Sequence, residues 1–163
     1  MWFLDVPPFD MLVSQAEPYG GFGDVLSSSE QVENQVAQTA IEARERIEQV
    51  FGIAMGTCFD TPRIIEELVQ KMWRDGWSPN NSSINLFTTD FGAVLVDEIR
   101  RCSGGSLIFR SATDLSHMSL WWPDRGIEVF PFHKMYKRLL ANDGESIEYF
   151  ANRIRKLTTN GTG

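Results

Sequence analysis

The chain has 163 residues, of which 42% are hydrophobic, 12% aromatic and 23% charged. A chain of this length buries about 70% of the surface that it exposes when unfolded, which suffices for one hydrophobic core. This composition excludes a disordered or fibrous protein. No apolar run approaches the ~18 residues that a membrane helix requires, so we expect no membrane contact.

The net charge of −7 is unevenly distributed. Residues 1–60 carry a net charge of −8, and the remaining residues carry +1. An acidic field of this kind repels nucleic acid and favours a basic partner at modest salt. The alternative is that the charge serves solubility alone.

The two cysteines, Cys58 and Cys102, lie far apart, without a CxxC motif or a histidine at ligand spacing. We predict two buried thiols in a reducing compartment, and no metal. Residues 1–8 lack the basic start of a signal peptide and contain an aspartate and two prolines. The sequence therefore predicts a cytoplasmic location.

Residues 1–26 are rich in proline, glycine and aromatic residues, which predicts an irregular arm. Its aromatic side chains predict that the arm packs on the domain or on a second subunit. We expect one domain over residues 27–158 and a frayed tail over residues 159–163.

The clearest helical pattern follows the arm. Ser27-x-x-Glu30 is a capping-box pattern, and apolar residues then recur at spacings of three and four until Gly52. The pattern predicts a helix over residues 28–51. The apolar positions are Val32, Val36, Ala40, Ala43, Ile47 and Val50.

Two further helices are predicted before residue 106. Thr61-Pro62 supplies an N-cap and a first-turn proline for a helix that ends at Asp75-Gly76. Residues 78–83 read as a loop, after which Thr88 or Thr89 caps a third helix. Gly104-Gly105 closes that helix.

The C-terminal part begins with short branched and aromatic segments at residues 107–109, 118–122 and 127–130. Residues 123–126 form a turn with proline early and glycine late, so these segments predict a three-stranded antiparallel meander. Two amphipathic helices follow Pro131 and Glu145. The predicted fold class is α+β, with three N-terminal helices, a meander and two C-terminal helices.

A longer motif resembles a group of known domains. The helix beginning Phe91-Gly92-Ala93 leads through Gly104-Gly105 to Phe130-Pro131-Phe132, with Lys134 and Tyr136-Lys137-Arg138 after it. In this, residues 84–155 resemble small uncharacterised bacterial α+β domains, although Val96-Asp97 replaces the expected Gly-Glu. Some of those domains look like immunity or accessory proteins of toxin systems. The resemblance implies the same fold and supplies no catalytic residue.

Few residues indicate chemistry. His117 and His133 lie in and just after the meander, where they could approach each other. Asp97 and Glu98 point about 100° apart on their helix, so their natural partner is Arg101 rather than each other. An alternative reading combines Glu98, Arg101, His117 and His133 in a pocket between sheet and helices.

Three features indicate interaction. Glu42, Glu45 and Glu48 project from the first helix beside its apolar stripe. Trp121 and Trp122 point to opposite faces of a strand, so one of them can anchor a partner unless helices cover both faces. Lys134, Lys137, Arg138, Arg153, Arg155 and Lys156 form a basic cluster that could bind an anion or pair with the acidic helix.

These observations predict a non-enzymatic cytoplasmic interaction protein, of the immunity or accessory kind, with a basic protein partner and no cofactor. The alternatives are a small enzyme or ligand-binding domain, and a homodimer in which the N-terminal arm crosses between subunits. Nucleic acid is not an expected partner.

Overall fold

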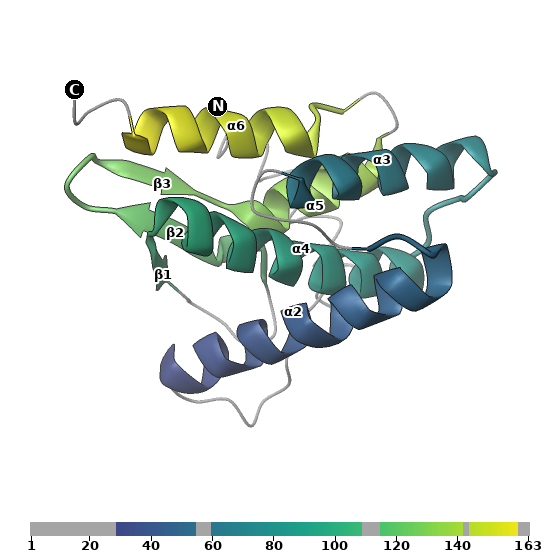
Figure 1. Cartoon of the computed structure of the whole chain (residues 1–163), viewed down its shortest axis with the longest axis horizontal. Helices are drawn as coiled ribbons and strands as arrows, with labels where there is room; N and C mark the ends of the chain where they lie inside the picture. Colours follow the sequence, from purple (N-terminus) through teal and green to yellow (C-terminus); the bar gives the residue numbers. More distant parts are fainter. Residues whose placement is uncertain (1–28, 55–59, 109–114, 142–143, 160–163) are drawn as a thin grey trace.

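The structure is a computed structural model that describes residues 29–54, 60–108, 115–141 and 144–159. Within them, three helices, a three-stranded antiparallel sheet and two helices follow one another, which confirms the predicted α+β class (Figure 1). The expected arm and residues 160–163 of the tail lie outside this part. The elements are α2 (Ser29–Phe51), α3 (Thr61–Arg74), α4 (Asn81–Ser103), β1 (Ser106–Ile108), the 3-10 turn η2 (Leu115–His117), β2 (Ser119–Trp122), β3 (Ile127–Val129), α5 (Pro131–Leu140) and α6 (Ile147–Thr159).

Helix α4 is the centre of the fold, with α2 packed along one side and α5 and α6 on the other (Figure 1). Because neighbours cover it on several sides, its middle is apolar all round, and residues 93–96 are fully buried. The apolar stripe of α2 from Val32 to Ile47 and the inner side of the sheet belong to one hydrophobic core, as expected, but the predicted stripe position Val50 is 74% exposed near the end of the helix. However, α2 packs mainly on α4 rather than on the sheet.

The sheet is the predicted meander, with the strand order β1-β2-β3 and both pairs antiparallel. Its register aligns Leu107, Leu120 and Val129 in one buried row across the three strands. The predicted turn over residues 123–126 joins β2 to β3, and Gly126 has a φ of +63°, which favours glycine. Both β1 and β3 are edge strands.

Two predicted helix starts are wrong. The N-cap of α3 is Asp60 rather than Thr61, which is already helical and fully buried. Helix α4 begins at Asn81, well before the predicted threonines, because the Asn80 side chain accepts from the Ser83 backbone N–H at 3.0 Å and the Asn80 backbone N–H donates to Ser83 Oγ at 3.2 Å. This capping box turns the second half of the expected loop, residues 81–83, into the first turn of the helix.

Gly92 permits the close contact between α4 and α5. A Cβ at this position would lie 2.4 Å from Cδ1 of Phe132, which is fully buried. Only a residue without a side chain lets that ring pack against the α4 backbone. The glycine of the Phe-Gly-Ala motif therefore has a packing role.

The prediction of free cysteine thiols is wrong for Cys102, which is disulfide-bonded at the C-terminal end of α4. The chain's other cysteine, Cys58, lies outside the described residues. Sequence separation carries no information about distance in the fold, so the pattern could not reveal this bond. Since disulfides persist mainly in oxidising compartments, the expected cytoplasmic location loses one of its two arguments.

Candidate functional site

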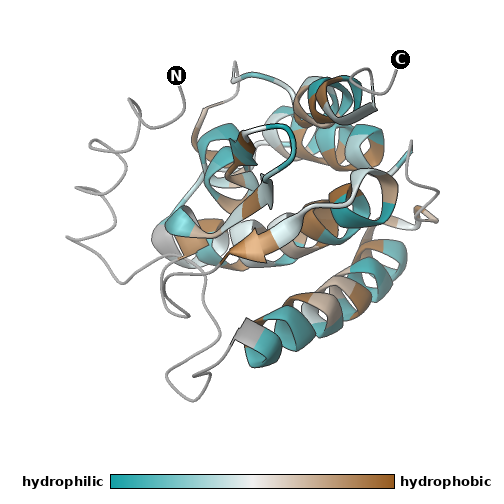
Figure 2. Cartoon of the chain, turned by 90° about the vertical axis from the view of Figure 1, so that its left-hand side faces the viewer, coloured by the Kyte–Doolittle hydropathy of each residue, from teal (hydrophilic) through white to brown (hydrophobic). Residues whose placement is uncertain are grey.

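The outer face of α2, turned away from α4, carries Gln38, Ile41, Glu42, Glu45 and Glu48, all of them exposed. Figure 2 shows hydrophilic residues along this side of the helix and hydrophobic ones toward the rest of the fold. Gln38 Nε2 donates to Glu42 Oε1 at 3.0 Å, and Ile41 is 52% exposed among the carboxylates. The three glutamates predicted as interaction residues thus share one solvent-facing surface.

Both arginines of α2 turn toward α4 rather than toward this outer face. Arg44 binds Asp97 at 2.9 Å and also binds Glu98, while Arg46 forms a two-pronged pair with Asp90 at 2.7 and 3.1 Å. These carboxylates on α4 neutralise the arginines at the helix interface. In the described part of α2, both arginines thus bind carboxylates of α4, while the glutamates of the outer face are exposed.

The pKa of Asp90, at the α2–α4 interface, is shifted by its surroundings. Burial raises the pKa of the Asp90 carboxyl, and the negative charge of Glu42 raises it further, against the opposing effect of Arg46. Glu42 therefore acts in the same direction as burial, and Arg46 opposes both.

The predicted pairing of Asp97 and Glu98 with Arg101 is confirmed. Arg101 lies 2.8 Å from Asp97 Oδ2 and 3.5 Å from Glu98 Oε1. No local pattern predicted the role of Arg44, which reaches both carboxylates from α2. Glu98 is 1% exposed, and its Oε2 has no hydrogen-bond partner among the described residues. Its other oxygen carries both arginine contacts.

The alternative site of Glu98, Arg101, His117 and His133 is not assembled in the pocket that Glu98 lines. That pocket, between α3, α4 and α6, has a volume of about 20 Å³, room for about one water molecule. Neither histidine lines it: His117 ends η2, and His133 is buried on α5. In the described ranges, no three His, Cys, Asp or Glu side chains are grouped as a metal site.

The two tryptophans of β2 differ in exposure. Trp122 is 8% exposed, and its indole N–H donates to the Ser103 carbonyl at 2.8 Å. Its ring lies against Gly105, where a Cβ would approach to 2.8 Å. Trp121 points to the opposite face and is partly exposed. Of this predicted pair, Trp121 is therefore the residue that a partner can reach.

The predicted basic cluster is divided between the interior and the surface. Lys134 is buried with its Nζ 3.1 Å from Glu145 Oε2, and burial lowers the pKa of Lys134 while Glu145 partly restores it. Arg138 is also buried, and it binds Glu66 of α3. These two ion pairs join α5 to the segment before α6 and to α3. The other members are exposed or half-buried: Lys137, Arg153, Arg155 and Lys156.

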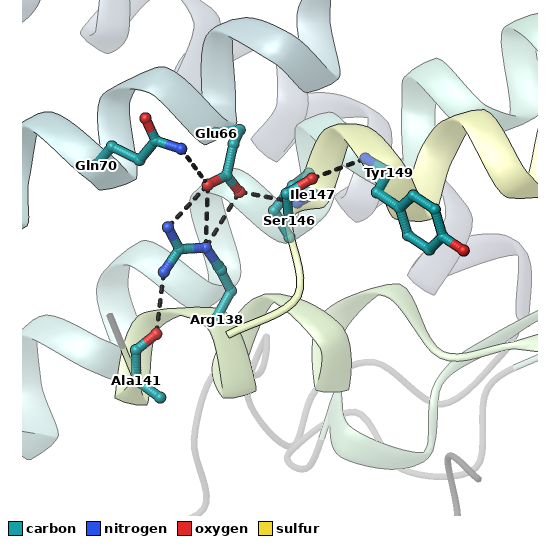
Figure 3. A network of polar contacts seen from close by, with 7 residues as sticks. All are labelled: Glu66, Gln70, Arg138, Ala141, Ser146, Ile147 and Tyr149. Carbon is teal, nitrogen blue, oxygen red and sulfur yellow. Dashed lines mark hydrogen bonds and ion pairs between the residues drawn. The ribbon is translucent and has the colours of Figure 1, made fainter. Parts of the chain in front are cut away.

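The Glu66–Arg138 pair is the centre of a buried polar network (Figure 3). Arg138 Nη2 lies 2.7 Å from Glu66 Oε2, and its Nε lies 3.1 Å from Oε1. The side chain of Gln70 and the backbone N–H of Ile147 donate to the same carboxylate at 2.9 and 2.8 Å. Arg138 also donates to the Ala141 carbonyl. The network joins α3, α5 and the start of α6.

The hydrogen bonds keep the Glu66 carboxylate ionised. Burial alone would raise the pKa of Glu66, but the bonds from Arg138, Ile147 and Gln70 outweigh burial and lower the pKa below its ordinary value. With these partners the network has a structural role. This pair was not predicted, although both charged residues stand within apolar stripes, which is the signal that could have revealed a buried pair.

A second feature that the sequence did not predict is a pocket of about 440 Å³ between β3, α5 and α6. Gly126 and all of β3 form one wall, and Lys137, Glu145 and one side of α6 form the other. Such a pocket depends on the packing of elements far apart in sequence. The residues of α6 that line it are Phe150, Arg153, Ile154 and Leu157.

Comparisons with family models, curated proteins and solved structures found no match to this chain. None of the helices in the described ranges has the length and apolarity to cross a bilayer.

Proposed function

We propose that this protein is a non-enzymatic interaction protein, whose outer face of α2 binds a basic protein partner. The observation that carries the proposal is the orientation of Arg44 and Arg46, which bind carboxylates of α4, while the glutamates of the outer face stay exposed to solvent. Charge complementarity of this kind speeds association and selects basic partners.

The outer face also offers an apolar contact. Ile41 is half-exposed between the glutamates. An apolar side chain surrounded by charges resembles the arrangement of a protein interface, in which a central contact excludes water and a polar rim sets specificity. Solubility alone would not require Ile41 at this position.

The role as an immunity or accessory factor rests on the resemblance of residues 84–155 to bacterial domains of that kind. Under this proposal the partner is a basic toxin or a basic client that the protein neutralises or escorts. The motif residues themselves, among them Gly92 and Arg138, support the fold rather than the partner contact.

The test is a quantitative capture from cells of the source organism with wild-type protein and the variant E42Q/E45Q/E48Q. We expect a stoichiometric basic protein with the wild type and its loss with the variant. Titration calorimetry with the purified partner should show binding that weakens steeply with salt.

The matched control is E67Q/D75N/D124N, which removes three exposed carboxylates elsewhere on the surface. It should retain the partner. If both triple variants retain it equally, or if the captured partner is acidic, the assignment of the outer face is wrong.

The ligand-binding alternative is favoured by one observation, the 440 Å³ pocket between β3, α5 and α6. This pocket lies between sheet and helices as that alternative requires, but it is built from other residues. The homodimer stays a prediction because the arm lies outside the described residues, and light scattering with and without residues 1–26 tests it.

A further inference from the structure

The geometry points to the pocket between β3, α5 and α6 as a binding site for a small amphiphilic carboxylate, a molecule with one carboxylate head and an apolar tail. Its volume of about 440 Å³ lies within the range of small-molecule sites in proteins, about 300–1,000 Å³. Its lining combines an apolar wall with a few charged side chains, which is the usual chemistry of such sites.

The apolar wall comes from both sides of the pocket. Ile127 and Val129 line it from β3, and Phe150, Ile154 and Leu157 line it from α6. The first four are largely or partly buried, while Leu157 keeps 48% exposure at the wall. A ligand tail lying here would cover the exposed parts of Leu157 and Ile127.

The charged residues of the pocket favour a single negative charge. Glu128 accepts from the Ser119 hydroxyl at 2.7 Å, and Glu145 binds Lys134 at 3.1 Å, so both carboxylates are engaged. Arg153 is exposed, and no ion pair joins it to another residue in the described part of the chain. Its guanidinium therefore remains available for a ligand.

The head group follows from this arrangement. A guanidinium matches a carboxylate with two parallel hydrogen bonds. Lys137 adds a second positive charge to the lining. The two glutamates oppose a dianion such as a phosphate monoester, because the lining as a whole carries two positive and two negative side chains.

This site is separate from the outer face of α2. Helices α2 and α6 lie on opposite sides of the molecule, with α4 between them (Figure 1). The two surfaces can be tested independently, and the variant E42Q/E45Q/E48Q should bind the ligand as the wild type does.

The test uses decanoate as the probe, with titration calorimetry and ¹⁵N-resolved NMR on the full chain. We expect saturable one-to-one binding and shift changes in residues 126–129 and 150–157. Decyltrimethylammonium, which has the same tail and opposite charge, should bind at least about tenfold more weakly. Decyl phosphate at about pH 8, where it is a dianion, should also bind more weakly than decanoate.

Variants assign the contacts. R153Q should weaken decanoate binding by about tenfold or more. The matched control K156Q, which removes an exposed charge of the same helix outside the pocket, should leave the affinity within about twofold. L157N should weaken binding without unfolding the chain, because Leu157 is half-exposed.

Several results would overturn the proposal. They are no saturable binding by the wild type, shift changes confined to other residues, or equal losses with R153Q and K156Q. Equal or tighter binding of decyl phosphate would overturn the carboxylate assignment. NMR spectra with native dispersion for each variant show that a loss comes from the pocket rather than from unfolding.

Discussion

The α2–α4 contact and the α3–α5–α6 contact both use arginine–carboxylate pairs, but at different depths. At the rim of the first, Arg46 and Asp90 keep side-chain exposures of 48% and 13%, and further in, Arg44 keeps 17% beside Glu98 at 1%, whereas both Arg138 and Glu66 are buried, at 2% and 6%. Exposed pairs contribute about 0–1 kcal/mol, and breaking a buried pair costs about 3–5 kcal/mol. Burial of the apolar stripe therefore holds α2 on α4, and the charged side chains of α2 determine which side of the helix faces solvent. Around α6 the ion pair itself is part of the core.

The largest effect should come from breaking the buried pair. R138Q leaves the Glu66 carboxylate buried without its arginine, so we expect a loss of about 3–5 kcal/mol in the free energy of unfolding. Urea denaturation measures it. The double variant E66L/R138M, which removes both charges, should lose less than R138Q. A loss below about 1 kcal/mol for R138Q would show that the pair contributes no more than a surface pair.

The next effect tests the tight packing at the centre. In G92A the new Cβ meets the Phe132 ring at 2.4 Å, so the ring or the α4 backbone has to move. Overpacking of this kind costs about 1–3 kcal/mol, which thermal unfolding followed by circular dichroism can measure. In an F132L background, where the ring is absent, the same substitution should cost clearly less.

Acid should act on the buried pair in a defined direction. Because the folded-state pKa of Glu66 is lowered, its ionised form stabilises the fold above the unfolded-state pKa, about 4.3. This contribution is lost as the pH falls through the lower, folded-state pKa. Urea midpoints measured across this range should fall with acidity, and the fall should be shallower in E66Q. If the urea midpoints of E66Q and wild type fall equally steeply with pH, the acid sensitivity does not come from Glu66.

The smallest effect should be at the rim of α2. R46Q removes an exposed pair and should cost less than about 1 kcal/mol. R44Q makes the sharper comparison, because it leaves the buried Glu98 with Arg101 as its remaining arginine. We expect R44Q to be the more destabilising of the two in urea denaturation. Equal losses in the free energy of unfolding for R44Q and R46Q would mean that the burial of Glu98 does not add to the cost of losing its arginine.

The elements that could be predicted from the sequence are those whose signal is local. The apolar spacing of α2 up to Gly52, the turn over residues 123–126 and the glycines closing α4 all act within a few residues. The Asn80–Ser83 capping box is equally local, but its polar composition also fits a loop. Propensity alone therefore placed the start of α4 too late.

The candidate sites depend on contacts that a local pattern cannot show. Arg44 meets Glu98 across 54 residues, and Arg138 meets Glu66 across 72. Helical spacing indicated that Glu42, Glu45 and Glu48 lie off the apolar stripe, which is why the outer face was predictable. Strand alternation separated Trp121 from Trp122 without telling which one faces the core. The pocket beside β3 arises only when the meander and α6 are packed together.

The bond at Cys102 has a practical consequence for every measurement on this protein. A cross-link that shortens the unfolded chain contributes about 2–4 kcal/mol, as large as most substitutions discussed above. Samples in which a thiol reductant has broken this bond should therefore unfold at a lower temperature than samples prepared without reductant. Variants can be compared only when their cysteine oxidation has been fixed and checked by mass spectrometry.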